Sequence, residues 1–492
     1  MTAILRSHQE RLLAQLDAAL VQGCNRIVAQ APTGFGKTIV AAHRLRLLQD
    51  AGKRAIFVVP ALSLIDQSIE KLYAEGVGDV GVMQANHLMT DYAQPIQIAS
   101  VQTLQRREVP PADEIIIDEV HRWYQFYPKL LADPRFANIP IIGLTATPWT
   151  RGLGKYFGRL IIGSTTRELI DTGYLSPFRA FAPASPDLTG VRTIAGDYHE
   201  GDLGEAMNKT VLVADVVTTW LERAAGRPTL CFAVDRAHAK NLQQKFLSED
   251  VSAEYIDCYT EAPERNAIAR RFHAGEVQVV CNVGCLTTGI DWDVRCIILA
   301  RPTKSEILYV QMIGRGLRTA DGKSDCLILD HSDNHIRLGF VTDIHYETLD
   351  EGKEKLSVRT VRAEALPKKC PKCTFLKPPK MLQCPCCGFM PVPPPKAVHM
   401  DGELIELTSR NTVTIASTTE KQNFYAELRR VAETRGYKGG WSAHKFKEKF
   451  GHFPPFAWNS QPSATPSPAT FRWVQSRNIA WAKSRHRVGG AA

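Results

Sequence analysis

Hydrophobic residues in the first 350 positions alternate between two kinds of segment. Short runs rich in β-branched residues are typical of buried parallel strands, and the longer segments between them carry apolar residues at helical spacing. Before residue 170 the strand-like runs lie at 26–30, 55–59, 97–100, 114–118 and 141–145, with helices near 38–50 and 62–74. After residue 208 they lie at 229–234, 253–257, 277–282, 296–301 and 325–330, with helices at 236–247, 263–273 and 305–317.

This alternation predicts an α/β protein with two doubly wound domains in tandem, at residues 1–170 and 208–350, joined by a bridging segment at 171–207. The pattern ends near residue 352. A cysteine-rich segment is expected to form a small module at 365–392. Residues 393–492 are expected to form a basic, aromatic region with proline-rich linkers, such as the segment 461–470.

Charge is divided unevenly between these regions. Residues 353–492 contain 24 Lys and Arg against 9 Asp and Glu, a net charge of +15, whereas residues 1–352 carry −6. The basic region is therefore the expected contact for nucleic acid. No apolar run approaches the ~18 residues of a membrane span, and the first residues lack the pattern of a signal peptide. We therefore expect a soluble, cytoplasmic chain with no membrane partner.

The aromatic residues of the basic region allow two interpretations. Ring faces could stack on nucleobases while neighbouring Lys and Arg meet phosphates. Alternatively, the spacing of Phe446, Phe450, Trp473 and Trp481 is that of the core face of small helices. Both interpretations stay open, and the region could also dock a protein partner.

The segment Ala31–Thr38 has the composition of a phosphate-binding loop between a strand and a helix. Gly34 and Gly36 would let the backbone approach phosphates, and the start of the following helix would supply amide donors. Lys37 could reach the β- and γ-phosphates, and the Thr38 hydroxyl could bind Mg²⁺. The usual pattern has Gly at position 31, where this chain has Ala.

A second motif follows the strand-like run at 114–118. Asp118 at the end of that run could hold Mg²⁺ beside the phosphates, and Glu119 could orient or deprotonate the attacking water. His121 could be a metal ligand or a general base, but in this motif it is more simply explained as a hydrogen-bonded link to the next motif. The two motifs together predict an ATP site.

These residues also carry a resemblance to a known family. Lys37, Asp118-Glu119-Val-His121, Gly143-Leu-Thr145-Ala-Thr147-Pro148 and Gln311–Arg318 resemble motifs I, II, III and VI of superfamily 2 helicases. The run from Asn282 to Asp330 looks most like the RadD-type bacterial and prophage helicases, although Asp291-Trp-Asp293 departs from their pattern. The resemblance covers roughly residues 1–390.

The resemblance implies two RecA-like lobes that hold ATP and Mg²⁺ between them. It implies that Lys37, Asp118, Glu119, His121, Gln311, Arg315 and Arg318 are catalytic, the two arginines acting as arginine fingers. Arg6 and Gln9 would face the adenine; Thr33, Gly34, Phe35, Gly36, Lys37, Thr38, Asp118, Gly289 and Asp291 complete the nucleotide site. Thr145 and Thr147 would couple hydrolysis to lobe movement, and nucleic acid would contact Pro60, Gln67, Ser100, Gln102, Thr287 and Thr288.

The cysteine-rich segment predicts a metal site. Cys370, Cys373, Cys384 and Cys387 form two Cys-x-x-Cys pairs, which suit tetrahedral Zn²⁺, and Cys386 could replace Cys387. Four thiolates leave no open position for chemistry, so the zinc would be structural.

The sequence as a whole predicts an ATP-dependent helicase or translocase that acts on DNA, the preference for DNA resting on the RadD-type resemblance. An RNA-dependent ATPase and an ATP-switched nucleic-acid scaffold are the alternatives. Glu119, Arg315 and Arg318 argue against the scaffold, since a switch does not need hydrolytic residues.

Overall fold

The computed structural model describes residues 4–84, 87–183, 185–287, 292–352, 366–391 and 417–488. The chain divides into two compact units, Met1–Pro393 and Pro394–Ala492, and each is described by itself. Within the described residues, no helix has both the length and the apolar character that a bilayer span requires.

The first lobe is built on a seven-stranded parallel sheet with the order β3-β4-β2-β5-β6-β1-β7. Its strands are β1 (Arg26–Gln30), β2 (Ala55–Val59), β3 (Val80–Val82), β4 (Ile96–Ser100), β5 (Glu114–Asp118), β6 (Ile141–Thr145) and β7 (Arg159–Ile162). Its helices are α1 (Ser7–Val21), α2 (Lys37–Asp50), η1 (Leu62–Leu64), α3 (Ile65–Ala74), α4 (Val101–Leu104), α5 (Phe126–Ala132), η2 (Pro134–Phe136), η3 (Leu153–Lys155) and α6 (Thr166–Asp171).

Side chains along each central strand alternate between two hydrophobic clusters. Ile27 and Ala29 of β1 pack with residues of α1 and α2, whereas Val28 packs on the other face with residues of α4 and α5. Both faces of the sheet are therefore covered, which explains why its strands are continuous apolar runs. The predicted strands of this lobe are confirmed, while β3 and β7 were not predicted.

The second lobe has a six-stranded parallel sheet with the order β12-β13-β11-β14-β15-β8. Its strands are β8 (Phe178–Phe181), β11 (Thr229–Phe232), β12 (Ala253–Ile256), β13 (Val279–Asn282), β14 (Cys296–Leu299) and β15 (Cys326–Asp330). Its helices are α7 (Glu200–Met207), α8 (Thr210–Arg223), α9 (Arg236–Ser248), α10 (Ala262–His273), η4 (Cys285–Thr287), α11 (Glu306–Gly314), α12 (Asn334–Leu338) and η5 (Val341–Asp343), and a hairpin joins β9 (Thr193–Ile194) to β10 (Asp197–Tyr198). The fold class predicted from the sequence is confirmed.

The segment predicted as a bridge contributes to the second sheet. Strand β8 lies within residues 171–207 and pairs in parallel with β15, so that Phe178 is opposite Cys326. Beyond η5 the chain returns to the first lobe, where the Asp350 carbonyl accepts a hydrogen bond of 2.8 Å from the Gly154 amide. Each lobe therefore uses residues from outside the continuous ranges predicted for it.

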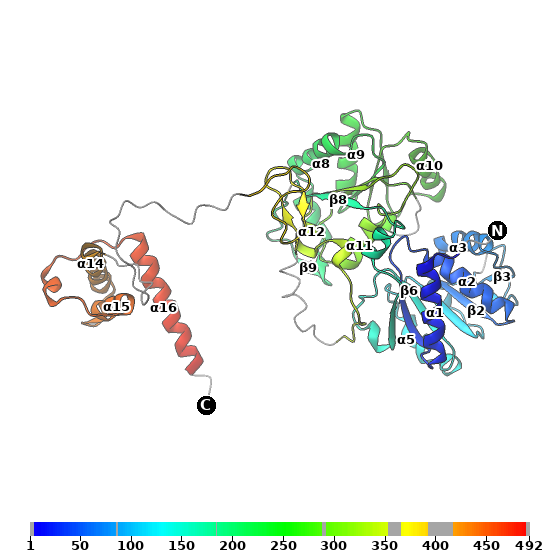
Figure 1. Cartoon of the computed structure of the whole chain (residues 1–492), viewed down its shortest axis with the longest axis horizontal. Helices are drawn as coiled ribbons and strands as arrows, with labels where there is room; N and C mark the ends of the chain where they lie inside the picture. The colour runs from blue at the N-terminus through cyan, green and yellow to red at the C-terminus, as the bar shows by residue number, and fades with distance from the viewer. Residues whose placement is uncertain are drawn as a thin grey trace. The chain divides into compact units, whose positions relative to one another are not determined.

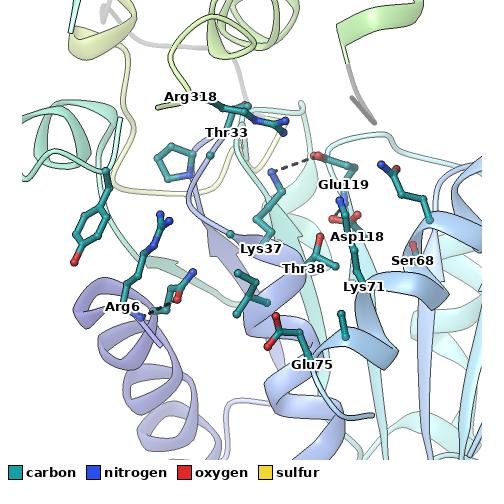
Figure 2. A pocket seen from close by; sticks show the side chains of 18 of the residues that line it. Arg6, Thr33, Lys37, Thr38, Ser68, Lys71, Glu75, Asp118, Glu119 and Arg318 are labelled. Atoms are coloured by element: carbon teal, nitrogen blue, oxygen red, sulfur yellow. Dashed lines mark hydrogen bonds and ion pairs between the residues drawn. The ribbon is translucent and has the colours of Figure 1, made fainter. Parts of the chain in front are cut away.

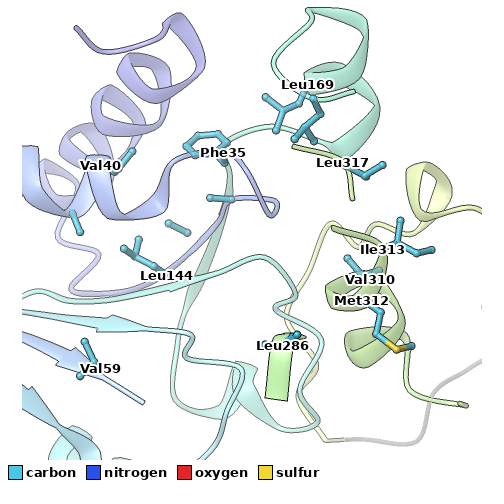
Figure 3. Close-up of a cluster of buried hydrophobic side chains, with 14 of the residues drawn as sticks. Phe35, Val40, Val59, Leu144, Leu169, Leu286, Val310, Met312, Ile313 and Leu317 are labelled. Atoms are coloured by element: carbon cyan, nitrogen blue, oxygen red, sulfur yellow. The ribbon is translucent and has the colours of Figure 1, made fainter. Parts of the chain in front are cut away.

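The two lobes lie side by side and share part of one hydrophobic core (Figure 1). Phe35 and Leu169 of the first lobe belong to the same buried cluster as Ile313 and Leu317 of the second (Figure 3). The approach is close, because a Cβ added to Gly314 would lie 2.7 Å from Thr33 Cβ. Glycine at 314 thus lets α11 reach the loop that precedes α2.

A small module follows the second lobe and packs on β8. It contains β16 (Lys368–Lys369) and β17 (Leu376–Lys377), which pair antiparallel. The Thr374 carbonyl accepts a hydrogen bond of 3.1 Å from the Ala182 amide, and the rings of Phe375 and Phe181 lie 5.4 Å apart. Strand β8 is therefore the edge strand of the second lobe on which this module packs.

The second unit is a small helical domain. Its elements are α14 (Thr418–Arg435), α15 (Trp441–Phe450), η6 (Phe456–Ser460) and α16 (Pro468–Val488). Phe446 is fully buried at its centre, and Phe450 and Trp473 pack against the same cluster. The core interpretation is therefore correct for Phe446, while Phe450 and Trp473 are only partly buried and both interpretations stay open for them.

Candidate nucleotide site between the lobes

The loop from Ala31 to Thr38 connects β1 to α2 in the form expected of a phosphate-binding loop. Gly34 and Gly36 have φ values of +88° and +92°, which only glycine adopts at little cost. The Ala31 amide donates a 2.8 Å hydrogen bond to the Thr145 carbonyl, so residue 31 still belongs to the sheet. Because residue 31 has no positive φ, alanine can stand where the common pattern has glycine.

Helix α1 holds this loop in place. Gln9 Nε2 donates a hydrogen bond of 2.9 Å to the Phe35 carbonyl, and Gln9 Oε1 accepts one of 2.9 Å from the Arg6 amide. The Phe35 side chain is fully buried in the core. The Phe35 ring is not among the residues that line the cavity beside the loop, so the predicted part of Phe35 in the nucleotide site rests on its backbone and stays a prediction.

The carboxylates of Asp118 and Glu119 lie at the end of β5, facing Lys37 (Figure 2). Lys37 Nζ is 3.4 Å from Glu119 Oε1, and His121 Nδ1 is 3.3 Å from Glu119 Oε2. Burial and the neighbouring Glu119 carboxylate raise the pKa of Asp118 to about 7. Burial by itself also raises the pKa of Glu119, but Lys37 and His121 outweigh it and hold that pKa below its usual range.

A chain of buried hydrogen bonds runs from this pair across to the second lobe. His121 Nδ1 lies 2.8 Å from Thr145 Oγ1, which also accepts a 3.0 Å hydrogen bond from the Thr147 amide. On its other side, His121 Nε2 lies 2.8 Å from Gln311 Nε2 of α11. Because an amide nitrogen can only donate, His121 Nε2 is the acceptor and Nδ1 carries the proton. The contact with Thr145 is the link to the next motif that the simpler interpretation described, whereas the contact with Gln311, which joins the two lobes, was not predicted.

The cavity at the loop has a volume of about 500 Å³ and is lined by both lobes. Of the residues predicted to bind the nucleotide, Arg6, Gln9, Thr33, Gly34, Gly36, Lys37, Thr38 and Asp118 line it. Glu119 and, from the second lobe, Arg315 line it as well. Arg318, also of the second lobe, lines it opposite Lys37 and Glu119 (Figure 2). His121, Thr145, Thr147 and Gln311 are not among the lining residues, and Gly289, Asp291 and Thr288 lie outside the described residues.

Several lining residues were not predicted from the sequence, and Tyr174, Ser68 and Lys71 are among them. Tyr174, just before β8, has the Arg6 guanidinium carbon 5.0 Å from its ring centroid. Ser68 and Lys71 of α3 line the side of the cavity next to Thr38. Only the tertiary fold brings these residues to the loop, because no motif spacing connects them to it.

The half-buried Lys323, which contacts the segment that carries the two arginines, was also not predicted. Lys323 Nζ donates hydrogen bonds to the carbonyls of Val294 (2.8 Å), Gly316 (2.6 Å) and Arg318 (2.5 Å). Burial lowers the pKa of this ammonium group. Lys323 therefore ties the segment that carries Arg315 and Arg318 to the amino-terminal edge of the second sheet.

Comparison with known proteins agrees with this geometry. Residues 2–150 match the family model described as type III restriction enzyme, res subunit, and residues 209–320 match the helicase conserved C-terminal domain. The chain belongs to superfamily 2 of the helicases. It is therefore an enzyme of the ATP-dependent helicase class.

Relatives of this superfamily 2 chain come from phage, yeast and bacteria. It is 28% identical to a 51.5 kDa protein of a Lactococcus phage, over 82% of this chain and 88% of that protein. It is 28% identical to the candidate ATP-dependent helicase IRC3 of Saccharomyces cerevisiae over 66% of this chain, and 27% identical to the type I restriction enzyme EcoKI endonuclease subunit of Escherichia coli over 64%. The chain spans only 51% of the yeast protein and 33% of the E. coli subunit.

A solved structure shows the same fold. The ATP-dependent type ISP restriction-modification enzyme LlaBIII bound to DNA aligns with a TM-score of 0.51 and 16% identity, over 67% of this chain and 28% of that one. The alignment supports the two-lobed helicase architecture alone.

The residues that the helicase motifs predicted to touch nucleic acid have varied surroundings. Gln67 lines the nucleotide cavity, and Gln102 Nε2 donates a 3.2 Å hydrogen bond to the Pro60 carbonyl. Ser100 is fully buried, and its hydroxyl caps α4 by accepting a hydrogen bond from the Thr103 amide. Thr287 is buried and donates a 3.0 Å hydrogen bond to the Gly284 carbonyl. Ser100 therefore shapes the start of α4 and is not placed to contact a ligand.

The four predicted zinc ligands lie together in the small module of this helicase. Their sulfur atoms are all within 4.8 Å of one another. Cys370 Sγ is 3.8 Å from Cys387 Sγ, and Cys373 Sγ is 3.6 Å from Cys384 Sγ. Tetrahedral zinc with Zn–S bonds of about 2.3 Å needs sulfur–sulfur distances of about 3.8 Å. The four thiols therefore fit such an ion, and Cys386 is exposed and outside the group.

Proposed function

We propose that this chain is an ATP-driven translocase or helicase that acts on DNA and belongs to the RadD-type branch of superfamily 2. The observation that carries the proposal is the composition of one cavity. Lys37, Asp118 and Glu119 enter it from the first lobe, and Arg315 and Arg318 enter it from the second. Hydrolysis then depends on the distance between the lobes, and this dependence is what a motor requires.

In the proposed reaction, the glycine-rich loop and Lys37 hold the β- and γ-phosphates of ATP. Glu119 accepts a proton from the attacking water, a role that its lowered pKa allows because the carboxylate is charged at neutral pH. Arg315 and Arg318 neutralise the charge that develops on the γ-phosphate. Mg²⁺, held by Thr38 and Asp118, would supply further positive charge at the phosphates.

We propose that His121 and Gln311 transmit structural changes in the nucleotide site between the two lobes. Their hydrogen bond exists only while α11 lies against the first lobe, and His121 also contacts Glu119 and Thr145. A movement of α11 on hydrolysis would therefore reach Thr145 and Thr147, which we propose as coupling residues.

DNA is preferred over RNA on two grounds. The relatives include a type I restriction enzyme endonuclease subunit, and the solved structure with the same fold is a DNA-bound enzyme. The RadD-type resemblance of residues 282–330 agrees. The cysteine module is proposed to hold one structural Zn²⁺ through Cys370, Cys373, Cys384 and Cys387, which would stabilise its packing on β8.

The test is the rate of ATP hydrolysis with no polymer, single-stranded DNA, forked DNA and RNA, measured in parallel. We expect stimulation by DNA. The variant Arg318→Ala should remove most of the stimulated rate while the protein still binds DNA, because the substituted residue lines the cavity from the second lobe. Stimulation by RNA alone would refute the choice of substrate, and an unchanged rate in Arg318→Ala would refute the mechanism.

A further inference from the structure

The second unit presents two phenylalanines outward on one short loop. This phenylalanine loop is the segment Gly451–Phe456, which follows α15 and ends at the first residue of η6. Phe453 is 49% exposed and Phe456 is 89% exposed. Neither ring belongs to the hydrophobic core of the unit, although the core is only a few residues away on both sides.

Residues at both ends of the loop pack on the core of the unit, and these contacts hold the two rings in their exposed positions. The rings of His452 and Trp458 pack on the buried ring of Phe446, with centroid distances of 5.6 Å and 5.9 Å. Asn459 Oδ1 accepts a 2.7 Å hydrogen bond from the Tyr425 hydroxyl. Pro454 and Pro455 stiffen the backbone between the two phenylalanines. Little conformational entropy would be lost when a ligand meets such a loop.

The electrostatic surroundings favour a polyanion. Residues 417–488 contain thirteen Lys and Arg against four Asp and Glu, a net charge of +9. The acids have partners inside the unit: Glu420 caps α14, Glu427 and Glu433 accept hydrogen bonds from Ser467 and Ser463, and Glu448 pairs with Lys445. Lys447 Nζ lies 4.4 Å from the centroid of the Phe453 ring, so a cation stands beside the exposed ring itself.

The exposed apolar side chains of this unit are aromatic, and this limits the class of ligand further. Among the residues of this unit whose side chains are described, the exposed large apolar side chains are Phe453, Phe456 and Phe471, with no aliphatic one beside them. A groove for a protein helix typically offers a continuous apolar surface. Flat rings beside cations are instead the arrangement that stacks on unpaired bases and meets their phosphates.

We propose that the phenylalanine loop binds single-stranded nucleic acid by stacking Phe453 and Phe456 on unpaired bases, while Lys447 and its neighbours contact the phosphates. The second unit is then a nucleic-acid anchor separate from the motor lobes. Its binding does not require ATP, so it can be tested whether or not the proposed motor activity holds.

The test uses the full chain without nucleotide and two fluorescent oligomers of equal length. One is oligo(dT), and the other is an abasic chain with the same phosphates and no bases. The double variant Phe453→Ala, Phe456→Ala should bind oligo(dT) at least roughly 30-fold more weakly, since each of the two lost stacks is worth about 1–3 kcal/mol. Binding to the abasic chain should stay the same, because the charges are unchanged.

Two matched variants complete the design. Phe456→Tyr should bind oligo(dT) as tightly as the parent protein. Phe456→Leu should bind it more weakly, since leucine is apolar but cannot stack. Phe471→Ala serves as the control, because it removes another exposed phenylalanine, which lies under Arg435. ATP hydrolysis without polymer should be unaffected in all of them.

Equal losses on both oligomers would overturn the proposal, since stacking cannot act on an abasic chain. Unchanged binding to both would overturn it too, and would indicate that the loop docks a protein. Equal weakening by Phe471→Ala would show that the loop is not the stacking site.

Discussion

Replacing Gln311 by Met should remove a hydrogen bond between the two lobes and lower ATP turnover, while ATP binding changes less. The change keeps the length of the side chain but removes the donor that lies 2.8 Å from His121 Nε2. Both residues are buried, so water cannot replace the lost partner. An orphaned buried acceptor costs about 1–3 kcal/mol, which corresponds to roughly a five- to 150-fold lower population of the closed arrangement.

We expect this loss in kcat for DNA-stimulated ATP hydrolysis. KM for ATP should change less, because Gln311 does not line the cavity. The matched control is Gln243→Met, which removes a glutamine of α9 whose amide donates to the Ala253 carbonyl, away from the first lobe. That variant should hydrolyse ATP at the parental rate.

A double-mutant cycle tests the assignment directly. In a His121→Phe background the acceptor is absent, so Gln311→Met should cost little more, and the two substitutions should be non-additive by about 1 kcal/mol or more. Additive losses in kcat would refute the link between His121 and Gln311. The reasoning would also fail if Gln311→Met alone left kcat unchanged.

Four further outcomes are expected. Glu119→Gln should retain ATP and DNA binding while turnover falls by ~10² or more, the scale of losing a positioned acid/base group; near-parental turnover would contradict the mechanism. Lys323→Met should lower kcat, because the three carbonyls that accept hydrogen bonds from Lys323, two of them in the arginine segment, lose their donor. Lys323→Arg keeps a cationic donor and should have a kcat between those of Lys323→Met and the parent. Equal kcat in the parent and both variants would rule out a positioning role. Purified protein should contain one zinc by elemental analysis, and Cys370→Ser with Cys373→Ser should release it and lower the unfolding temperature; absence of zinc in the parent would remove the metal from the proposal. Ending the chain after residue 395 should make the log–log salt dependence of DNA binding shallower by roughly 2 to 4 units if about three or four phosphate contacts are lost; an unchanged slope would show that the second unit does not carry them.

The central strands of both lobes could be predicted from the sequence. A strand that is buried on both faces is a continuous apolar run, such as Ile115–Ile117, and such short runs between turns are typical of parallel sheets. Strands β3 and β7 could not be predicted. The first is only Val-Gly-Val, and the second begins with arginine and lies where only three of the four positions are apolar. Their place in the sheet depends on neighbours far along the chain.

The same division holds for the nucleotide site. Lys37 and Asp118 follow from local motifs, since a glycine-rich loop and a strand-end carboxylate each carry their chemistry in a few residues. Tyr174 and Lys323 act through contacts with residues distant in sequence, and no local pattern marks them. In the second unit, helical spacing correctly indicated a core for Phe446, but it could not show that Phe456 faces outward.

Strand β8 has a consequence for how this protein can be divided into fragments. The second lobe takes its edge strand from residues that precede α8, and the cysteine module packs on that same strand. A fragment that begins near residue 208 would leave β15 with unpaired backbone groups along a flat apolar edge, which favours aggregation. A fragment that begins before Phe178 would keep the edge covered. A fragment limited to the helicase-domain match at 209–320 would lack β15 as well as β8, so the edge of β14 would be unpaired and we expect the product to aggregate.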